Sequence, residues 1–367
     1  MTALGKVLPA QPLARHLAVA VVGGIVAYFV TTHAGAYNDF QIAQVAVYGV
    51  ALGGLTLLTG HNGQISLGHG ALMAVGAYIA ALIILHLHIP LGLSILAGGV
   101  GGAIFGVIVG VAAARLRGPY LAGVTLALAL ALPEVAVKYQ SVLGGEQGLG
   151  VTPPAPPGAM PGSQWLAWIC LIGALAVMVL LANLGRSRFG RAFRAVRDDE
   201  IAASLAGINV ARTQVLAFVV SAACAGLAGS FLALVTAIAS PGEFTIALSI
   251  ELLAGMVVGG TGSLTGAWWG AVVLVLVPRW SVDVAKATGL SSGVSSNLAL
   301  AFYGLVLIVV MILAPSGIQG GFRRLAGLGR SPTVGPLATL RLRRPARSGR
   351  PARLVAPAGQ GPPDPAP

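Results

Sequence analysis

Most of this chain consists of apolar stretches that are long enough to cross a lipid bilayer. A transmembrane helix needs about 20 mostly apolar residues, and eight stretches come close to that length. The chain is 56% hydrophobic and only 9% charged, which is too little charge to cover a soluble protein. A soluble enzyme, a disordered protein and a disulfide scaffold are therefore excluded. The eight candidate helices are 17–32, 40–59, 64–85, 91–114, 119–137, 164–184, 213–239 and 296–314.

A ninth apolar stretch, residues 246–277, is too long for a single membrane helix. It is interrupted at residues 259–263 by the run Gly-Gly-Thr-Gly-Ser. Glycine interruptions of this kind are typical of broken membrane helices. We interpret the stretch as two short membrane segments that meet at a glycine break. The sequence thus predicts an all-α, polytopic integral membrane protein of about ten segments.

The positive charge of the chain is distributed in a way that predicts its orientation. The net charge is +12, and the Lys and Arg residues gather in short segments between the apolar stretches. With the amino terminus in the cytoplasm, 19 of the 22 basic residues are cytoplasmic, and only Lys138, Arg279 and Lys286 are outside. This asymmetry follows the positive-inside rule and predicts no nucleic-acid partner. It requires that residues 246–277 cross the membrane twice or re-enter it.

Three parts are expected along the chain. Residues 1–16 form a cytoplasmic amino-terminal segment, and residues 17–321 form the transmembrane domain. The first apolar run is interpreted as an uncleaved helix because many further spans follow it. Residues 322–367 form a basic, Pro- and Arg-rich cytoplasmic tail that buries too little apolar surface to be ordered. The predicted location is the bacterial plasma (inner) membrane, with both termini cytoplasmic and the lipid bilayer around the helices.

The cytoplasmic loop 185–212 is amphipathic and too polar to enter the bilayer. Asp198, Asp199 and Glu200 stand where a short helix is expected to begin. Carboxylates at that position accept hydrogen bonds from free N–H groups and suit the positive end of the helix dipole. The sequence therefore predicts a helix from about residue 200.

The predicted helix is apolar on one side and has a stop signal at its end. Ile201, Leu205 and Ile208 share one face at helical spacing, and Gly207 is typical of a helix C-terminal cap. Such a helix is suited to docking into a groove of a partner protein. A plain interfacial helix that lies on lipid is an equally good interpretation of these residues alone.

Five motifs resemble those of one transporter family. Glu200-Ile-Ala-Ala followed by Gly207 is similar to the "EAA" loop with which ABC importer permeases dock onto their ATPase. Residues 63–70 (Gly-Gln-Ile-Ser-Leu-Gly-His-Gly), which run into Gly-Ala-Tyr at 76–78, resemble a signature of the branched-chain amino acid permeases. So do residues 117–121 (Arg-Gly-Pro-Tyr-Leu), 144–149 (Gly-Gly-Glu-Gln-Gly-Leu) and 259–266. The resemblance covers about residues 40–315 and is stronger to the second of the family's two permease types.

The resemblance implies several partners. They are cytoplasmic ABC ATPase subunits, a homologous second permease subunit in a heterodimer, and a soluble substrate-binding protein. The chain contains no Gly-x-x-x-x-Gly-Lys-Ser/Thr sequence, so it has no P-loop for ATP hydrolysis. We expect no cofactor on this chain and ATP use by the partner. The residues predicted to couple the permease to the ATPase are Arg194, Arg197, Asp198, Asp199, Glu200, Ala203, Leu205 and Gly207.

Glycine breaks at residues 60–70 and 259–270 stand in the two halves of the membrane domain. Paired breaks are typical of a transport site built from broken helices, whose ends suit a zwitterionic amino acid. Tight helix crossing is the alternative reason for each glycine. Glu251 is a candidate because a carboxylate within a membrane is costly to bury. We expect His69 to hydrogen-bond backbone at a helix break rather than to bind a metal, and no metal site is predicted. The substrate-pathway candidates are Gln64, Ser66, Gly68, His69, Gly259, Gly260, Gly262, Ser263 and Glu251.

The sequence thus predicts the membrane-spanning permease subunit of an ATP-driven importer, with no enzymatic activity of its own. The resemblance implies branched-chain amino acids as the substrate. Related small polar metabolites such as urea, short amides or other amino acids stay open. The alternative from another class is a stand-alone secondary transporter or channel.

Overall fold

The computed structural model describes residues 35–87, 89–114, 119–287 and 317–325, together with the isolated positions 23–24, 31–32, 304–305, 308–309 and 312. The predicted segment 1–16 and most of segments 17–32, 296–314 and 322–367 therefore lie outside the described residues. The chain divides into two units, Met1–Phe322 and Arg323–Pro367. The description below concerns the first unit.

Six helices of the described part are long and apolar enough to span a membrane. Two shorter apolar helices follow them and are separated at the glycine break, as predicted. These eight helices match eight of the ten expected segments, and they confirm the all-α membrane fold. The six are Ala36–His61, which joins α2 (Ala36–Leu55) to the π-helix η2 (Thr56–His61), then α3 (His69–Leu87), α4 (Leu91–Ala113), α5 (Pro119–Lys138), α7 (Gly162–Arg186) and α10 (Val210–Thr236); the shorter two are α11 (Ile246–Gly259) and α12 (Leu264–Ala287).

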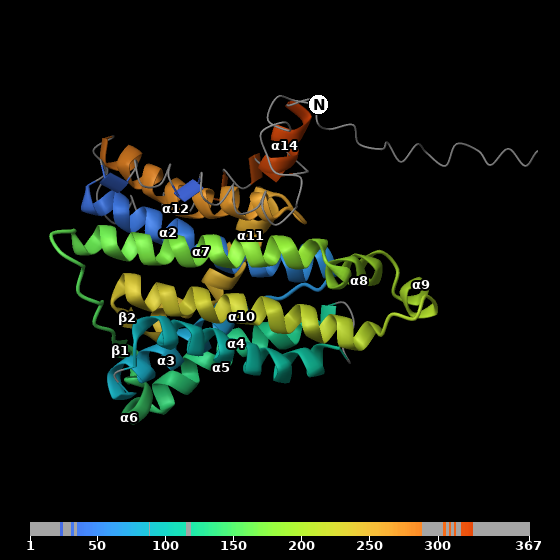
Figure 1. The fold of residues 1–367 in the computed structure, drawn as a ribbon, viewed down its shortest axis with the longest axis horizontal. Coiled ribbons are helices and arrows are strands. Elements are labelled where there is room, and N and C mark those ends of the chain that lie inside the picture. The colour runs from blue at the N-terminus through green and yellow to red at the C-terminus, as the bar shows by residue number, and fades with distance from the viewer. Residues whose placement is uncertain are drawn as a thin grey trace, which may run out of the picture. The chain divides into compact units, whose positions relative to one another are not determined.

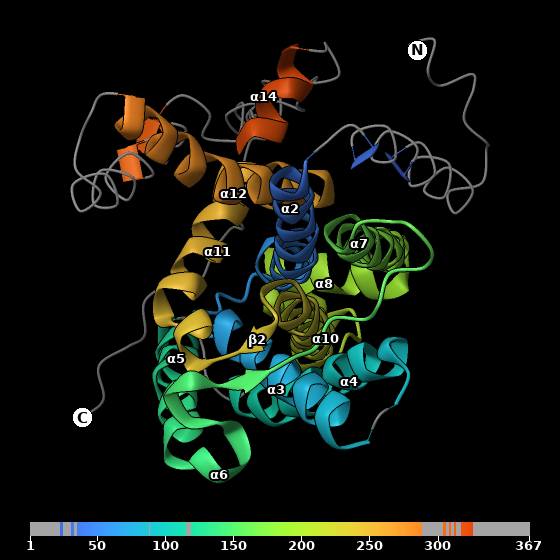
Figure 2. The same ribbon diagram turned by 90° about the vertical axis from the view of Figure 1, so that its left-hand side faces the viewer.

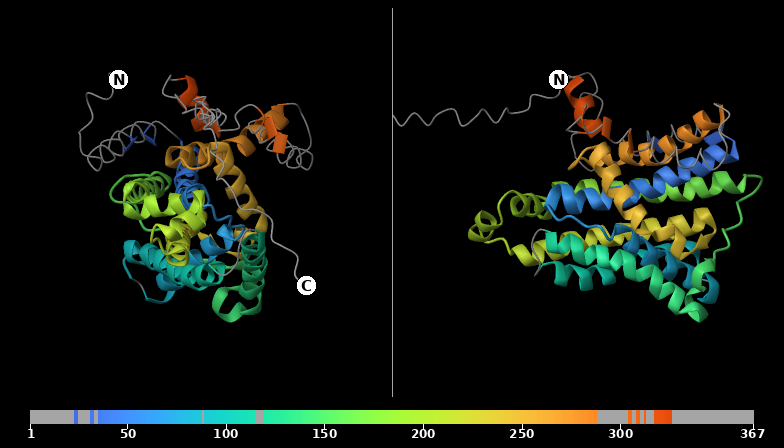
Figure 3. Two further views of the ribbon diagram at one scale, coloured as in Figure 1. Left: turned by 90° about the vertical axis from the view of Figure 1, so that its right-hand side faces the viewer. Right: turned by 180° about the vertical axis from the view of Figure 1, so that it is seen from behind.

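Short elements gather at the two opposite ends of the long helices (Figure 1). One end, called here the hairpin end, carries α6 (Gln140–Leu143) and the strands β1 (Leu149–Gly150) and β2 (Ile238–Ala239), which pair antiparallel. The 3-10 helices η3 (Gly145–Gln147) and η4 (Pro241–Phe244) flank these strands in sequence. The other end carries α8 (Arg188–Asp198) and α9 (Glu200–Leu205), and the view from behind shows the same separation (Figure 3). A further helix, α14, spans Gly317–Leu325.

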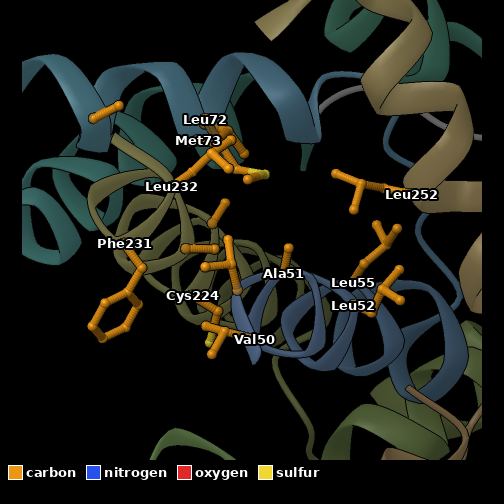
Figure 4. Packing of buried hydrophobic residues seen from close by; sticks show 14 of the residues in the cluster. Val50, Ala51, Leu52, Leu55, Leu72, Met73, Cys224, Phe231, Leu232 and Leu252 are labelled. Carbon is orange, nitrogen blue, oxygen red and sulfur yellow. The ribbon is translucent and has the colours of Figure 1, made fainter. Parts of the chain in front are cut away.

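Helix α10 lies in the middle of the bundle. It packs most extensively against α4, α3 and α2, and α2 packs in turn against α7 and α12 (Figure 2). Val50 and Leu52 of α2, Met73 of α3, Leu232 of α10 and Leu252 of α11 are all buried (Figure 4). The core therefore joins helices from both halves of the chain.

Glycines permit the closest helix crossings. A Cβ added at Gly76 of α3 would overlap the backbone of Gly226 in α10, and one added at Gly226 would overlap the carbonyl of Gly98 in α4. The hydroxyl of Ser230 donates to the Gly76 carbonyl at 3.1 Å across the same crossing. Small residues let helix backbones approach in membranes, where apolar side chains gain little by leaving lipid. Gly76, Gly226 and Gly98 therefore permit tight helix crossings.

We predict that Gly76→Ala destabilises the bundle by about 1–3 kcal/mol, because the added methyl group overpacks a backbone contact. Thermal unfolding of the purified protein in detergent measures the effect. Gly123→Ala is the matched control, since Gly123 is an exposed α5 residue whose added Cβ would meet nothing within 4 Å. Equal melting temperatures for the two variants would contradict the close crossing.

Candidate functional site

The candidate coupling site begins with helix α8, which was not predicted from the sequence. Ser187 caps its start by accepting a hydrogen bond from the Phe189 N–H at 3.2 Å. Gly190, Phe193 and Val196 are buried. The spacing of these three residues, with arginines between them, is the signal that would have revealed the helix. Their burial holds α8 against α7 and α10.

Helix α9 begins as predicted, with an acidic cap. The carboxylate of Asp199 accepts hydrogen bonds from the Ile201 N–H at 2.8 Å and from the Ala202 N–H at 3.0 Å. The backbone of Asp199 is extended, with φ −161° and ψ 112°. This residue therefore both turns the chain out of α8 and satisfies the first free N–H groups of α9.

The end of α9 also confirms the predicted glycine cap. Gly207 has φ +83°, a left-handed conformation that favours glycine. Its N–H donates to the Ser204 carbonyl, and the Ile208 N–H donates to the Ala203 carbonyl, both at 3.0 Å. This pair of hydrogen bonds is the Schellman motif. A six-residue helix thus has its backbone groups satisfied at both ends.

Two contacts hold α9 against the rest of the protein. The side chain of Gln214, on α10, donates to the Glu200 carboxylate at 2.8 Å. Ala203 is buried. Glu200 therefore faces α10, and Gln214 is a supporting residue that sequence reasoning missed, because nothing in its local sequence points to Glu200.

The opposite side of α9 presents large apolar side chains. Ile201 is 74% exposed and Leu205 is 84% exposed. Leu205 was among the predicted coupling residues, whereas Ile201 was placed on the same face but left out of that set. Large apolar side chains that gather on one exposed face are typical of a contact surface. Ile201 and Leu205 are called here the docking face.

The two predicted arginines contact backbone carbonyls of the protein itself. Arg194 donates to the Gly185 carbonyl at 2.9 Å, near the end of α7. Arg197 donates to the Gly60 carbonyl at 2.7 Å and pairs with the neighbouring Asp198. Both side chains therefore fasten α8 to other helices.

The two glycine breaks, which are far apart in sequence, lie against each other. A Cβ added at Gly60 would come within 2.5 Å of the Gly262 nitrogen. The His61 Nε2–H donates to the Gly262 carbonyl at 3.2 Å. The term glycine junction is used below for residues 60–63 and 259–262. It adjoins α8, since Arg197 reaches it, and it includes His61, which was not among the residues predicted from the sequence.

The second half of the junction is a tight turn between α11 and α12. Helix α11 ends at Gly259, and Gly260 and Gly262 have φ +120° and +84°. A Cβ at Gly259 would overlap the backbone of Gly266. The hydroxyl groups of Ser263 and Thr265 lie 2.9 Å apart just beyond the turn. Glycine is needed here for both conformation and close approach.

The first break continues into buried polar residues before α3. Gln64, Ser66 and His69 are all buried. The His69 Nε2–H donates to the Ala51 carbonyl of α2 at 3.1 Å. The expected hydrogen bond from His69 to backbone is therefore present.

This segment also connects α5 and α11. A Cβ at Gly68 would come within 2.5 Å of the Thr125 carbonyl oxygen of α5. The Gly70 N–H donates to the Ser249 hydroxyl of α11 at 3.0 Å. Glu251 is partly buried on α11, about two turns before Gly259. The proposed substrate pathway through these residues stays a prediction.

Membrane-spanning helices that are broken at glycines, together with an apolar face on a capped helix at one end, are features of a membrane transport subunit. The family model described as "Branched-chain amino acid transport system / permease component" matches residues 37–311, and the chain belongs to this family. It is therefore a permease subunit of an ABC importer.

Individual relatives agree with the family match. The chain is 28% identical to the high-affinity branched-chain amino acid transport permease LivM of Salmonella typhimurium, over 77% of this chain and 70% of LivM. It is also 28% identical to LivH of Escherichia coli K12, over 75% of this chain and 92% of LivH. Among solved structures, a chain of "PsaBC from Streptococcus pneumoniae in complex with Fab" matches with a TM-score of 0.43 and 12% identity, covering 84% of this chain and 99% of that chain. This likeness is too distant to carry an argument.

We predict that Asp199→Ala frays the start of α9, because loss of an N-cap costs about 0.5–2 kcal/mol. Amide hydrogen exchange at Ile201 and Ala202 should become faster. Asp199→Asn is the control, since asparagine caps helices equally well. Identical exchange in the alanine and asparagine variants would show that the carboxylate does not hold this helix.

Proposed function

We propose that this permease imports branched-chain amino acids with energy from cytoplasmic ABC ATPase subunits that dock on α9. The support for the substrate is the family description and the printed names of LivM and LivH. Urea, short amides and other amino acids are the competing substrates. Family membership favours this function over a stand-alone secondary transporter or channel.

The observation that carries the docking proposal is the exposure of Ile201 and Leu205 on a helix that is capped at both ends. Helix α9 is the outermost labelled element at its end of the bundle, beyond the ends of α7 and α10 (Figure 1). A helix in this place is better positioned for a partner protein than for lipid. An amphipathic helix that inserts into a groove is a common mode of recognition.

The charge distribution supports a cytoplasmic location for the α8–α9 end. Residues 186–212, from the last residue of α7 to the first turn of α10, carry six arginines. At the hairpin end, α5 finishes with Lys138. Arg279 lies 4.6 Å above the ring of Tyr37, at the start of α2. Under the positive-inside rule, this distribution supports the proposal that the hairpin end lies outside and that both termini lie in the cytoplasm of a bacterium.

The remaining partners follow from the same proposal. The chain has no P-loop sequence, so ATP is bound and hydrolysed by the separate ATPase. LivM-type and LivH-type permeases are both among its relatives, which supports a heterodimer with a second permease. A soluble binding protein would deliver substrate at the hairpin end.

We predict that Leu205→Glu leaves the permease in the membrane but abolishes co-purification of the ATPase and uptake of leucine. A charge buried without a partner in the interface costs about 3–5 kcal/mol, whereas the same charge in water costs little. Leu205→Met is the matched control and should behave as the wild type. Normal ATPase binding and uptake by Leu205→Glu would exclude α9 as the docking element.

A further inference from the structure

We propose that Arg197 is a positioning residue that links α9, called here the docking helix, to the glycine junction. This inference rests on the proposed function, because it concerns how ATPase docking reaches the membrane helices. It assigns Arg197 a role inside the permease instead of the predicted role toward the ATPase.

The guanidinium group of Arg197 bridges two parts of the chain. Its Nε and Nη2 donate to the Asp198 carboxylate at 2.9 and 2.7 Å. Its Nη1 donates to the Gly60 carbonyl at 2.7 Å. Asp198 ends α8 and precedes Asp199, which caps α9. One rigid, planar group thus joins the α8–α9 corner to the end of η2.

The end of η2 is suited to receive this cation. The last carbonyl groups of a helix have no partner within the helix and carry a partial negative charge. Gly63 has φ +80°, and a Cβ there would come within 3.0 Å of the Arg197 Cγ. The absence of a side chain at Gly63 leaves room for the stem of the arginine.

From Gly60 the connection continues to the turn between α11 and α12. Gly60 lies against the backbone of Gly262, and His61 donates to the Gly262 carbonyl. A displacement of the α8–α9 corner would therefore be transmitted to both glycine breaks at once. Both breaks lie where the backbone adopts conformations that need glycine. Small backbone rotations there would therefore change the direction of the attached helices.

Other arginines of α8 provide a contrast. Arg191 donates to the Arg186 carbonyl at 3.3 Å, at the end of the preceding helix α7. Arg197 instead reaches a residue 137 positions away in the sequence. Arg191 is therefore a matched control, since it has the same charge on the same helix and its hydrogen bond goes to the neighbouring helix end.

The first test uses the permease reconstituted with its second permease, its ATPase and its binding protein in proteoliposomes. We expect Arg197→Ala to retain the ATPase while leucine transported per ATP hydrolysed falls by about tenfold, the loss expected when the charge-assisted hydrogen bond to the Gly60 carbonyl is removed. Arg197→Lys keeps the positive charge and a donating ammonium group, and it should restore part of this ratio. Arg191→Ala should match the wild type.

The second test uses the permease alone and does not depend on the ATPase. Amide hydrogen exchange in a peptide covering residues 259–266 should become faster in Arg197→Ala and stay unchanged in Arg191→Ala. Unchanged exchange, an unchanged transport ratio, or loss of the ATPase from both Arg197 variants would each overturn the link. Failure of the wild type to bind an ATPase would overturn the proposed function instead, while the exchange result still decides the link.

Discussion

Close approach of glycine backbones is the constraint on which the rest of this structure depends. Within a bilayer, apolar side chains gain little by leaving lipid, so helices associate mainly through tight packing and interhelical hydrogen bonds. Gly76 and Gly226 place α3 directly on α10, and Gly60 and Gly262 bring the two breaks together. A methyl group on Gly76 or on Gly60 would overlap the facing backbone. The positions of α10 and of the α11–α12 turn follow from these contacts, and the bundle then positions α8 and α9.

The α8–α9 end combines a rigid docking face with polar connections into the bundle. Caps at both ends of α9 and the Gln214–Glu200 hydrogen bond hold the helix in place, while Leu205 stays exposed. Arg197 connects the same corner to Gly60. Local capping therefore provides a stiff element, and one long-range arginine contact provides the route by which its movement can reach the membrane helices.

Much of this arrangement could be predicted from the sequence because the signals are local. Apolar stretches predicted the helices, and Asp199 and Gly207 predicted the limits of α9, since caps depend on residues within a few positions. The contact between Gly60 and Gly262 could not be predicted in this way, because it joins residues about 200 positions apart. Arg197 was assigned to the ATPase surface because its charge and its place in the loop do not reveal that its donors are used inside the permease.

The link through Arg197 requires that helix α9 and the glycine junction move together. Spin labels on cysteines at Ala206 and Thr261 test it most directly, with a third label at Gln147 at the hairpin end, after replacement of Cys170 and Cys224. Distances are measured by pulsed electron paramagnetic resonance in the ATPase complex, with and without a non-hydrolysable ATP analogue. The account predicts an unchanged distance between labels 206 and 261, while both distances to label 147 change. A change between 206 and 261 as large as the change between 206 and 147 would contradict it.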